Sequence, residues 1–86
     1  MTSGKGTLTD LERRILRFFH EHPHAVETAR GVAAWIGDET QAIQEAVQAL
    51  SKRRWLTADE TSAVTGYALT RDDRCLAQIR SALGDG

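Results

Sequence analysis

The apolar side chains between Val32 and Leu50 recur with the spacing of helices that bury one face. They fall in two sets: Val32, Ala33 and Ile36, and then Ile43, Ala46, Val47 and Leu50. Gly37 separates the two sets, and a glycine there lets the backbone take a positive φ and end the first helix within one residue. The pattern therefore predicts two helices joined by one tight turn, a helix-turn-helix.

Another helix is predicted between Thr9 and Pro23. Thr9 and Glu12 have the spacing of a capping box, in which each side chain bonds the other residue's backbone N–H. Its apolar stripe consists of Leu11, Ile15, Phe18 and Phe19. Pro23 pushes the preceding residue out of the helical region, so this helix should end near residues 20–22. Residues 24–27 then predict a short edge strand or an extended connection.

The sequence also predicts a capping residue for each helix of the helix-turn-helix. Thr28 is expected to cap the helix over residues 29–36, because its hydroxyl accepts from free backbone N–H groups. Asp38, with Gln41 three residues later, is expected to cap the following helix in the same way. That helix should extend to about Arg53.

After this helix the hydrophobic period changes from 3.6 to 2. Residues 55–59 and 65–69 are rich in aromatic, β-branched and alternating side chains, which predicts two strands joined by a loop over residues 60–64. Thr70 is then expected to cap a last helix, whose apolar side consists of Leu76, Ile79 and Leu83. A two-stranded hairpin is marginal alone, so it must lie against the helices.

The elements together predict a mainly α fold with a small β-hairpin, of the α+β class. The expected order is helix, short extended piece, helix, helix, strand, strand, helix. A chain of 86 residues forms one core and hardly more. We expect a single domain over residues 8–83, with flexible termini at residues 1–7 and 84–86.

Two segments suggest a known fold family: AAWIGDETQAIQEAVQALSKRRWL and GYALTRDDRCLAQI. The first resembles the helix, turn, recognition helix and strand of winged helix-turn-helix domains, as in bacterial transcription regulators of the MarR, PadR and ArsR types. The second resembles the strand that leaves the wing and enters the next helix. The resemblance covers about residues 8–83. It implies a regulator of transcription that binds double-stranded DNA, with the helix over 38–53 in the major groove and the hairpin around 59–64 as the wing.

The resemblance also implies which side chains face the DNA bases. They are the residues of the third helix that the core does not need: Glu39, Thr40, Gln41, Gln44, Glu45 and Gln48. Glutamine bonds an adenine edge through two contacts, which favours Gln41, Gln44 and Gln48 as base readers. Glutamine is also a common solvent-exposed helix former, so the same pattern fits an ordinary polar surface.

Basic residues that reach the DNA backbone are expected on either side of this helix. Arg30 precedes it, and Lys52 and Arg53 lie at its end. The alternative for Lys52 and Arg53 is that they only interact with the helix dipole, because cations are favoured at a helix C-terminus.

The charge balance does not favour nucleic acid. The formal net charge is −1 and the pI about 6.3, whereas nucleic-acid-binding domains commonly have a pI above about 9. The expected reading surface, residues 38–50 and 57–66, contains five acidic side chains and no basic one: Asp38, Glu39, Glu45, Asp59 and Glu60. A second hypothesis follows, in which the chain is a protein-interaction module whose acidic third helix and wing meet a basic partner.

Arg54 and the wing depart from the pattern of the winged-helix family. Family members commonly have glycine where this chain has Arg54, and lysine or arginine in the wing. Arginine at this position implies a different helix ending or backbone strain.

Three histidines stand close together but do not form a metal-binding pattern. His20, His22 and His24 are spaced two residues apart around Pro23, which breaks the backbone, and on a helix residues two apart point in different directions. We expect solvated histidines at a helix end and no metal or other cofactor.

The remaining candidate residues have structural interpretations. Cys75 is expected to be a small buried hydrophobe, the alternative being a redox-sensing thiolate near a helix start. Trp35 and Trp55 are expected to be core or half-buried supports. No nucleophile and base pair, phosphate-binding loop or metal motif indicates an enzyme.

The composition and the last helix give expectations for location and assembly. A single cysteine suits a reducing cytoplasm, and no apolar stretch reaches the roughly 18 residues of a membrane span. We therefore expect a cytoplasmic protein without membrane contact. The last helix, residues 71–83, is the candidate element for a homodimer.

Overall fold

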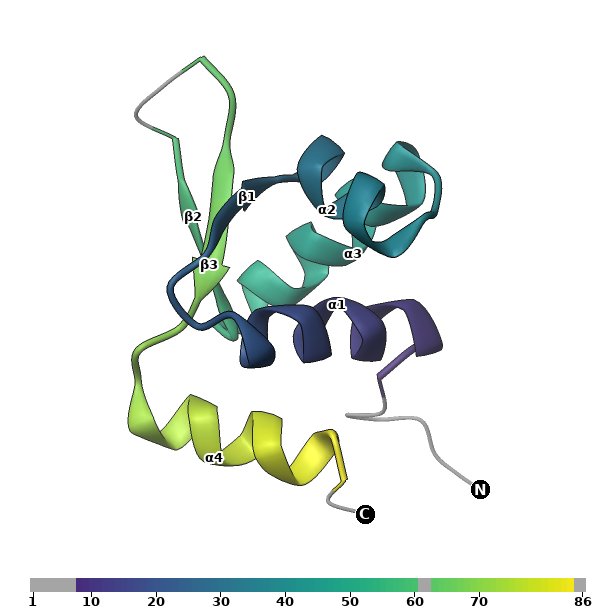
Figure 1. Ribbon diagram of the computed structural model, residues 1–86. Coiled ribbons are helices and arrows are strands. Elements are labelled where there is room, and N and C mark those ends of the chain that lie inside the picture. The colour runs from purple at the N-terminus through teal and green to yellow at the C-terminus, as the bar shows by residue number, and fades with distance from the viewer. Residues whose placement is uncertain (1–7, 61–62, 85–86) are drawn as a thin grey trace.

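The computed structural model describes residues 8–60 and 63–84 of the chain. Its helices and strands follow the predicted order, which confirms the mainly α fold with a small hairpin (Figure 1). They are α1 Asp10–Glu21, β1 Val26–Thr28, α2 Ala29–Ile36, α3 Thr40–Lys52, β2 Leu56–Asp59, β3 Gly66–Leu69 and α4 Asp73–Ala82. Of the termini expected to be flexible, residues 1–7 and 85–86 lie outside the described residues.

The hairpin of β2 and β3 gains a third strand from β1. The strand order is β1-β3-β2, and both pairs are antiparallel. Tyr67 of β3 lies opposite Glu27 on one side and Ala58 on the other. The segment before α2, expected as an edge strand or an extended connection, is thus a strand. Because α2 begins at the residue after β1, this pairing connects the hairpin to the helices.

The hydrophobic core lies where α1, α2 and α3 meet the sheet. Its largest fully buried side chains are Phe19, Ile15, Leu16, Ile43, Leu50, Leu56, Ile79, Val32 and Val47. The apolar positions predicted for α3 are all buried. Those predicted for α2 are buried at Val32 and Ala33, and Ile36 packs half-buried against them. The periodicity therefore identified the correct faces of both helices.

Two predicted helix starts are confirmed. Thr9 Oγ1 accepts a hydrogen bond from the Glu12 N–H at 3.0 Å, and Glu12 Oε1 accepts one from the Thr9 N–H at 3.0 Å. At α2, Thr28 Oγ1 accepts from the Gly31 N–H, also at 3.0 Å. Each bond satisfies a backbone donor that has no partner within its helix.

The predicted cap of α3 is wrong. The helix begins at Thr40 with Glu39 in the capping position, and no side chain caps it. Asp38 Oδ1 instead accepts from the adjacent Glu39 N–H at 2.7 Å. The Asp38 carboxylate also forms an ion pair with Arg14 of α1 at 3.3 Å, so a contact with another helix draws it away from the helix start.

The predicted cap of α4 is wrong as well. Asp72 caps this helix, and its Oδ1 accepts from the Arg74 N–H at 2.8 Å. Thr70 is buried at the end of β3, and its hydroxyl accepts from the Asp72 N–H at 3.1 Å. Because the core holds Thr70, the helix starts only after the chain has turned outward.

The turn between α2 and α3 takes the predicted form. Gly37 has a φ of 81°, and its N–H donates to the Ala33 carbonyl at 2.7 Å. A left-handed residue at this point is the usual end of a helix, and glycine adopts it without a steric penalty. The expected helix-turn-helix is therefore present.

The end of α3 has the backbone of a glycine ending but an arginine in the critical position. Arg54 has a φ of 69°. The Trp55 N–H donates to the Leu50 carbonyl at 3.1 Å, and the Arg54 N–H donates to the Ser51 carbonyl at 2.9 Å. These bonds define a Schellman motif, in which the left-handed residue is usually glycine. Of the two expected outcomes, the chain keeps the usual helix ending and carries the strain at Arg54.

The two tryptophans differ in burial. Trp55 is 7% exposed, as expected for a core support. Trp35 is 64% exposed, so the expectation of a buried or half-buried position is wrong. It lies on the surface beside Phe18 and His22, with ring centroids 5.4 and 5.9 Å away. The rings of Trp35, Phe18 and His22 therefore cover one another only partly, and Trp35 stays largely in contact with water.

A few long-range contacts attach α4 to the rest of the molecule. Ile79 is fully buried, and Leu76 and Leu83 are half-buried against the core. Arg13 Nη1 donates to the Ala82 carbonyl at 2.6 Å, and Trp55 Nε1 donates to Gln78 Oε1 at 3.1 Å. Within residues 8–60 and 63–84, none of the helices is long and apolar enough to cross a membrane.

Candidate nucleic-acid interface

The solvent side of α3 presents most of the side chains expected to read bases. Thr40, Gln41 and Gln48 are exposed. Gln41 Nε2 donates to Glu45 Oε2 at 3.3 Å, a contact between residues four apart on the same face. Among the residues that the structure describes, Gln48 has no hydrogen-bond partner for its side-chain amide, so the amide oxygen and nitrogen can both meet a base edge.

Gln44 differs from the other two glutamines because it points toward the hairpin. It is half-buried, and its Nε2 lies 3.5 Å from the Tyr67 hydroxyl. Tyr67 itself is buried on the inner face of β3. The sequence analysis did not single out Tyr67. The alternation of buried residues along β3, Tyr67 and Leu69, is the signal that would have placed it on the buried face of the strand.

A trough runs between α3 and the hairpin. It consists of two hollows of about 340 and 250 Å³, and both are lined by Gln44, Thr65 and Tyr67. Arg30 lines the first hollow and Lys52 the second, so the trough has one cation in each part. The fold thus brings Arg30 and Lys52, which are 22 residues apart in sequence, to the same surface as the glutamines.

Arg53 does not lie in this trough. Its guanidinium carbon lies 5.2 Å from the centre of the Trp55 ring, a cation–π contact. Of the three predicted backbone contacts, the structure therefore places Arg30 and Lys52 along the trough and Arg53 at the base of the hairpin. The helix-dipole alternative for Lys52 remains compatible with its place in the last turn of α3.

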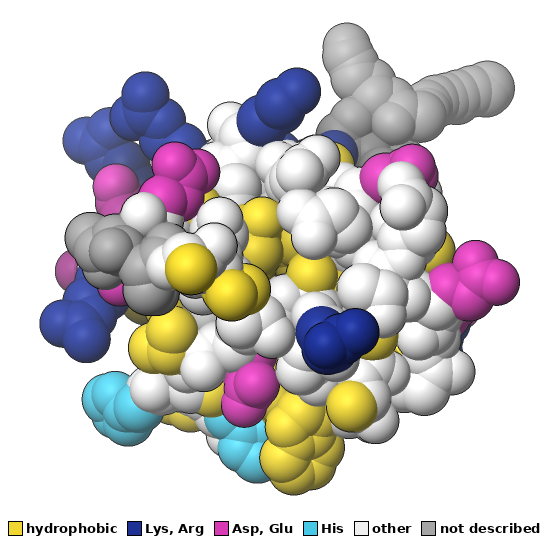
Figure 2. All heavy atoms as spheres, turned by 90° about the horizontal axis from the view of Figure 1, so that it is seen from above, with side chains coloured by type: hydrophobic (Ala, Val, Ile, Leu, Met, Phe, Trp, Pro, Cys, Tyr) yellow, Lys and Arg dark blue, Asp and Glu magenta, His cyan; other side chains and the backbone are white. Residues whose placement is uncertain are grey.

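Charges of both signs surround this face. Figure 2 shows it from above, with Lys and Arg side chains and acidic side chains scattered among uncharged surface and not gathered in one patch of either sign. Asp59 and Glu60 are exposed on the hairpin, and Glu39 and Glu45 on α3. Residues 61–62 of the expected wing lie outside the described residues. In the described part, the face forms neither a continuous basic band nor an unbroken acidic surface.

The other candidate residues do not assemble into a second site. His20 and His24 border a groove beside α4, whereas His22 packs at a tilt against Phe18 with the ring centroids 5.0 Å apart. In residues 8–60 and 63–84, no group of three or more His, Cys, Asp or Glu side chains is arranged to hold a metal ion. Cys75 is half-buried and packs against the core, as a small hydrophobe would.

The chain resembles solved structures although its sequence matches no family model and no curated protein. A possible transcriptional regulator from Methanosarcina mazei Go1 superposes with a TM-score of 0.76 at 14% identity, over 88% of this chain and 68% of that one. An antimony-specific transcriptional repressor, AntR, superposes with a TM-score of 0.68 at 24% identity, over 87% of this chain and 65% of that one. A single-residue mutant of Lactococcus lactis ZitR in complex with DNA gives a TM-score of 0.67 at 17% identity, over 93% and 53%.

These superpositions, with the helix-turn-helix and the hairpin that follows it, decide the architecture. The chain has a winged-helix fold. The resemblance noted in the sequence is thereby confirmed for the fold, with α3 in the place of the recognition helix and the β2–β3 hairpin as the wing. The winged helix spans between about half and two thirds of the length of these three solved proteins. At such low identities the likeness concerns the fold alone.

Proposed function

We propose that this winged helix binds double-stranded DNA and regulates transcription. The observation that carries the proposal is the exposed polar face of α3 beside the wing, with one cation in each part of the trough between them. In such a complex α3 enters the major groove and the wing lies on the adjacent backbone. A regulatory protein of this kind has no catalytic role, in line with the absence of a catalytic motif in the sequence.

The proposed contacts divide into base readers and backbone contacts. Gln41, Gln48 and Thr40 meet base edges, because their side chains project from the exposed face of α3. Gln44 is less free to read bases, since its amide nitrogen already contacts the Tyr67 hydroxyl. Arg30 and Lys52 contact phosphates on the two sides of the groove, and Arg53 does so from its stacked position on Trp55.

The charge distribution predicts binding that depends less steeply on salt than that of proteins with about six to ten phosphate contacts. Three phosphate contacts give a slope of log K against log salt of about −2.7, at roughly 0.9 per neutralised phosphate. The acidic groups Glu45 and Glu60 lie on the same face and oppose the approach of phosphate. Base contacts and the fit of α3 into the groove must therefore contribute much of the affinity.

The direct test is a fluorescence anisotropy titration of a labelled duplex of mixed sequence at about 50 and about 200 mM salt. We expect binding at the lower salt and the small slope given above. Lys52→Ala should weaken binding to all sequences and reduce the slope by about 1, whereas Gln48→Ala should weaken binding without changing the slope. Arg74→Ala, on the exposed side of α4, is the matched control. Absence of binding at the lower salt, where electrostatic attraction is strongest, would refute the proposal.

The alternative of an acidic protein-binding face is less well supported. It was based on five acidic and no basic side chains, but the fold adds Arg30 and Lys52 to the same trough. An acidic surface interrupted by cations is a poor match for a uniformly basic partner. DNA therefore remains the proposed ligand of this face.

We also propose a homodimer, because a two-fold protein matches a palindromic DNA site. The helix over residues 71–83 was the candidate dimer element. In the structure its large apolar side chains, Leu76, Ile79 and Leu83, pack toward the core, and its exposed side carries polar residues such as Arg74 and Gln78. Light scattering at several protein concentrations tests this assembly, and a constant monomer mass would exclude it.

A further inference from the structure

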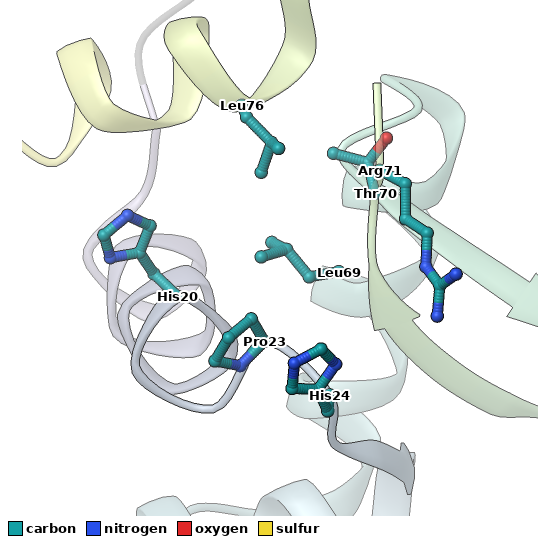
Figure 3. A pocket seen from close by; sticks show the side chains of 7 residues that line it. All are labelled: His20, Pro23, His24, Leu69, Thr70, Arg71 and Leu76. Carbon is teal, nitrogen blue, oxygen red and sulfur yellow. The ribbon is translucent and has the colours of Figure 1, made fainter. Parts of the chain in front are cut away.

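A shallow groove runs between α1 and α4. Its two hollows have volumes of about 470 and 390 Å³ and share His20 as a lining residue, so they are adjacent parts of one elongated groove. Figure 3 shows the first hollow open between His20 of α1 and Leu76 of α4, with Leu69 at its inner side. In Figure 1, α2 and the start of α3 lie on the other side of α1 from α4. The groove is thus separate from the proposed DNA-binding face.

The inner wall of the groove is apolar. Leu69, Leu76 and Pro23 line the first hollow, and Leu83 lines the second. Leu69 is buried, whereas Leu76 and Leu83 are half-buried although they pack against the core. The two half-buried leucines keep part of their apolar surface in contact with water. Covering that surface is favourable by about 25 cal/mol for each Å².

The edges of the groove are basic. Arg71 lines the first hollow, Arg17 and Arg80 line the second, and all three side chains are exposed. None of the three forms an ion pair with another described residue. Glu21 is the single acidic residue that lines either hollow among the residues that the structure describes. This local excess of positive charge contrasts with the net charge of −1 of the whole chain.

We propose that this groove binds an amphipathic α-helix of a partner protein whose apolar stripe is bordered by acidic residues. The apolar stripe would cover Leu69, Leu76 and Leu83, and the carboxylates would lie beside the arginines. A helix suits the shape because the groove is elongated and lies between two helices, where a third helix packs by the ordinary ridge-and-groove geometry. The groove is also open along its length, whereas small-molecule sites enclose most of their ligand.

A second copy of this chain does not provide such a helix. In the described residues the apolar faces of all four helices face the core, and the part of α4 that stays uncovered, at Leu76 and Leu83, belongs to the groove itself. The large apolar side chains that the described part leaves exposed are Val26, Trp35 and Val64, which belong to three different elements or loops. The partner is therefore a different protein, and a homodimer through α4 would use the polar side of this helix, with Arg74 and Gln78, which do not line the groove. Because the groove and α3 are on different sides of α1, the partner and DNA would bind without competing.

The test uses the full chain and a synthetic fluorescent peptide as the probe. The peptide is an amphipathic helix with leucines at positions i, i+3, i+4 and i+7 and glutamates on both flanks. One control peptide carries lysine in place of every glutamate, and another has the same composition in scrambled order. In fluorescence anisotropy we expect the acidic peptide to bind at least about tenfold more tightly than either control.

Charge reversal of the groove provides the decisive comparison. The combined change Arg17→Glu, Arg71→Glu and Arg80→Glu affects only exposed side chains, so circular dichroism should show an unchanged fold. It should weaken binding of the acidic peptide by about tenfold or more and strengthen binding of the lysine peptide. Arg74→Glu, an equally exposed change on α4 outside the groove, should alter the affinity by less than about twofold.

Several results would overturn the proposal. They include equal binding of the acidic and lysine peptides, and an unchanged affinity in the charge-reversed chain. Binding of a fatty carboxylate in this groove without binding of the peptide would show a small-molecule site instead. A loss of peptide binding leaves the DNA proposal unaffected, because the duplex is titrated separately and none of the three arginines is a proposed DNA contact.

Discussion

Replacing Arg54 by glycine should stabilise this protein. Arg54 is the left-handed residue of the Schellman motif that ends α3, with a φ of 69°. A residue with a Cβ pays a steric penalty of about 1–2 kcal/mol in this conformation, because the Cβ approaches the following carbonyl oxygen. Glycine avoids this penalty, and Arg54→Gly removes it without changing the hydrogen bonds of the motif, which involve only backbone atoms.

The size of the effect depends on two opposing contributions. Glycine gives the unfolded chain more conformational freedom, which costs about 0.5–1 kcal/mol. The net increase in the free energy of unfolding should therefore be about 0.5–1 kcal/mol. For a domain of this size, 1 kcal/mol corresponds to about 4–8 °C in Tm, so the expected rise is about 2–8 °C. The loss of the arginine side chain adds little, because this side chain is exposed.

Urea unfolding followed by tryptophan fluorescence measures this change, since Trp55 is buried in the folded state. Arg54→Ala is the matched control, because it removes the guanidinium and retains the Cβ that causes the strain. Arg53→Gly is the second control, since Arg53 has a right-handed conformation and glycine there should destabilise the protein. The reasoning is refuted if Arg54→Gly is no more stable than Arg54→Ala.

Thermal or urea unfolding of single variants checks three further predictions. Thr28→Ala should lower the free energy of unfolding by about 1 kcal/mol, because Thr28 caps α2, whereas Asp38→Ala should cost less than half as much. Trp55→Ala should lower the free energy of unfolding by about 3–5 kcal/mol, and Trp35→Ala by less than about 1 kcal/mol, because Trp55 is 7% exposed and Trp35 64%. Equal losses for the two variants would contradict this difference in burial. Ile79→Ala should cost about 2–5 kcal/mol, because this fully buried side chain fastens α4; a neutral effect would show that α4 is not docked.

The candidate site was only partly predictable from the sequence. The surface position of Gln41 and Gln48 followed from the helical period, since the core uses the opposite side of α3. The contact of Gln44 with Tyr67 could not be predicted, because it joins two residues 23 positions apart. A similar separation, 22 positions, explains why Arg30 and Lys52 appear together in the trough only after folding.

The helices, the turn at Gly37 and the hairpin were determined by the sequence itself. Capping, hydrophobic period and the conformational freedom of glycine all act between residues a few positions apart, so these signals are readable along the chain. The strain at Arg54 belongs to the same class, because glycine is the residue usual at that step of the helix ending.

Only the tertiary structure decided which neighbour covers each apolar surface. The period of α2 showed an apolar face but not that Trp35 lies outside it, with its ring tilted against that of Phe18 of α1. The cap of α4 shifted from Thr70 to Asp72 because the core holds Thr70 at the end of β3. The groove between α1 and α4 likewise exists because helices far apart in sequence pack without covering Leu76 and Leu83 fully. A sequence pattern shows which side chains are apolar, whereas the packing of distant segments determines which of them are buried.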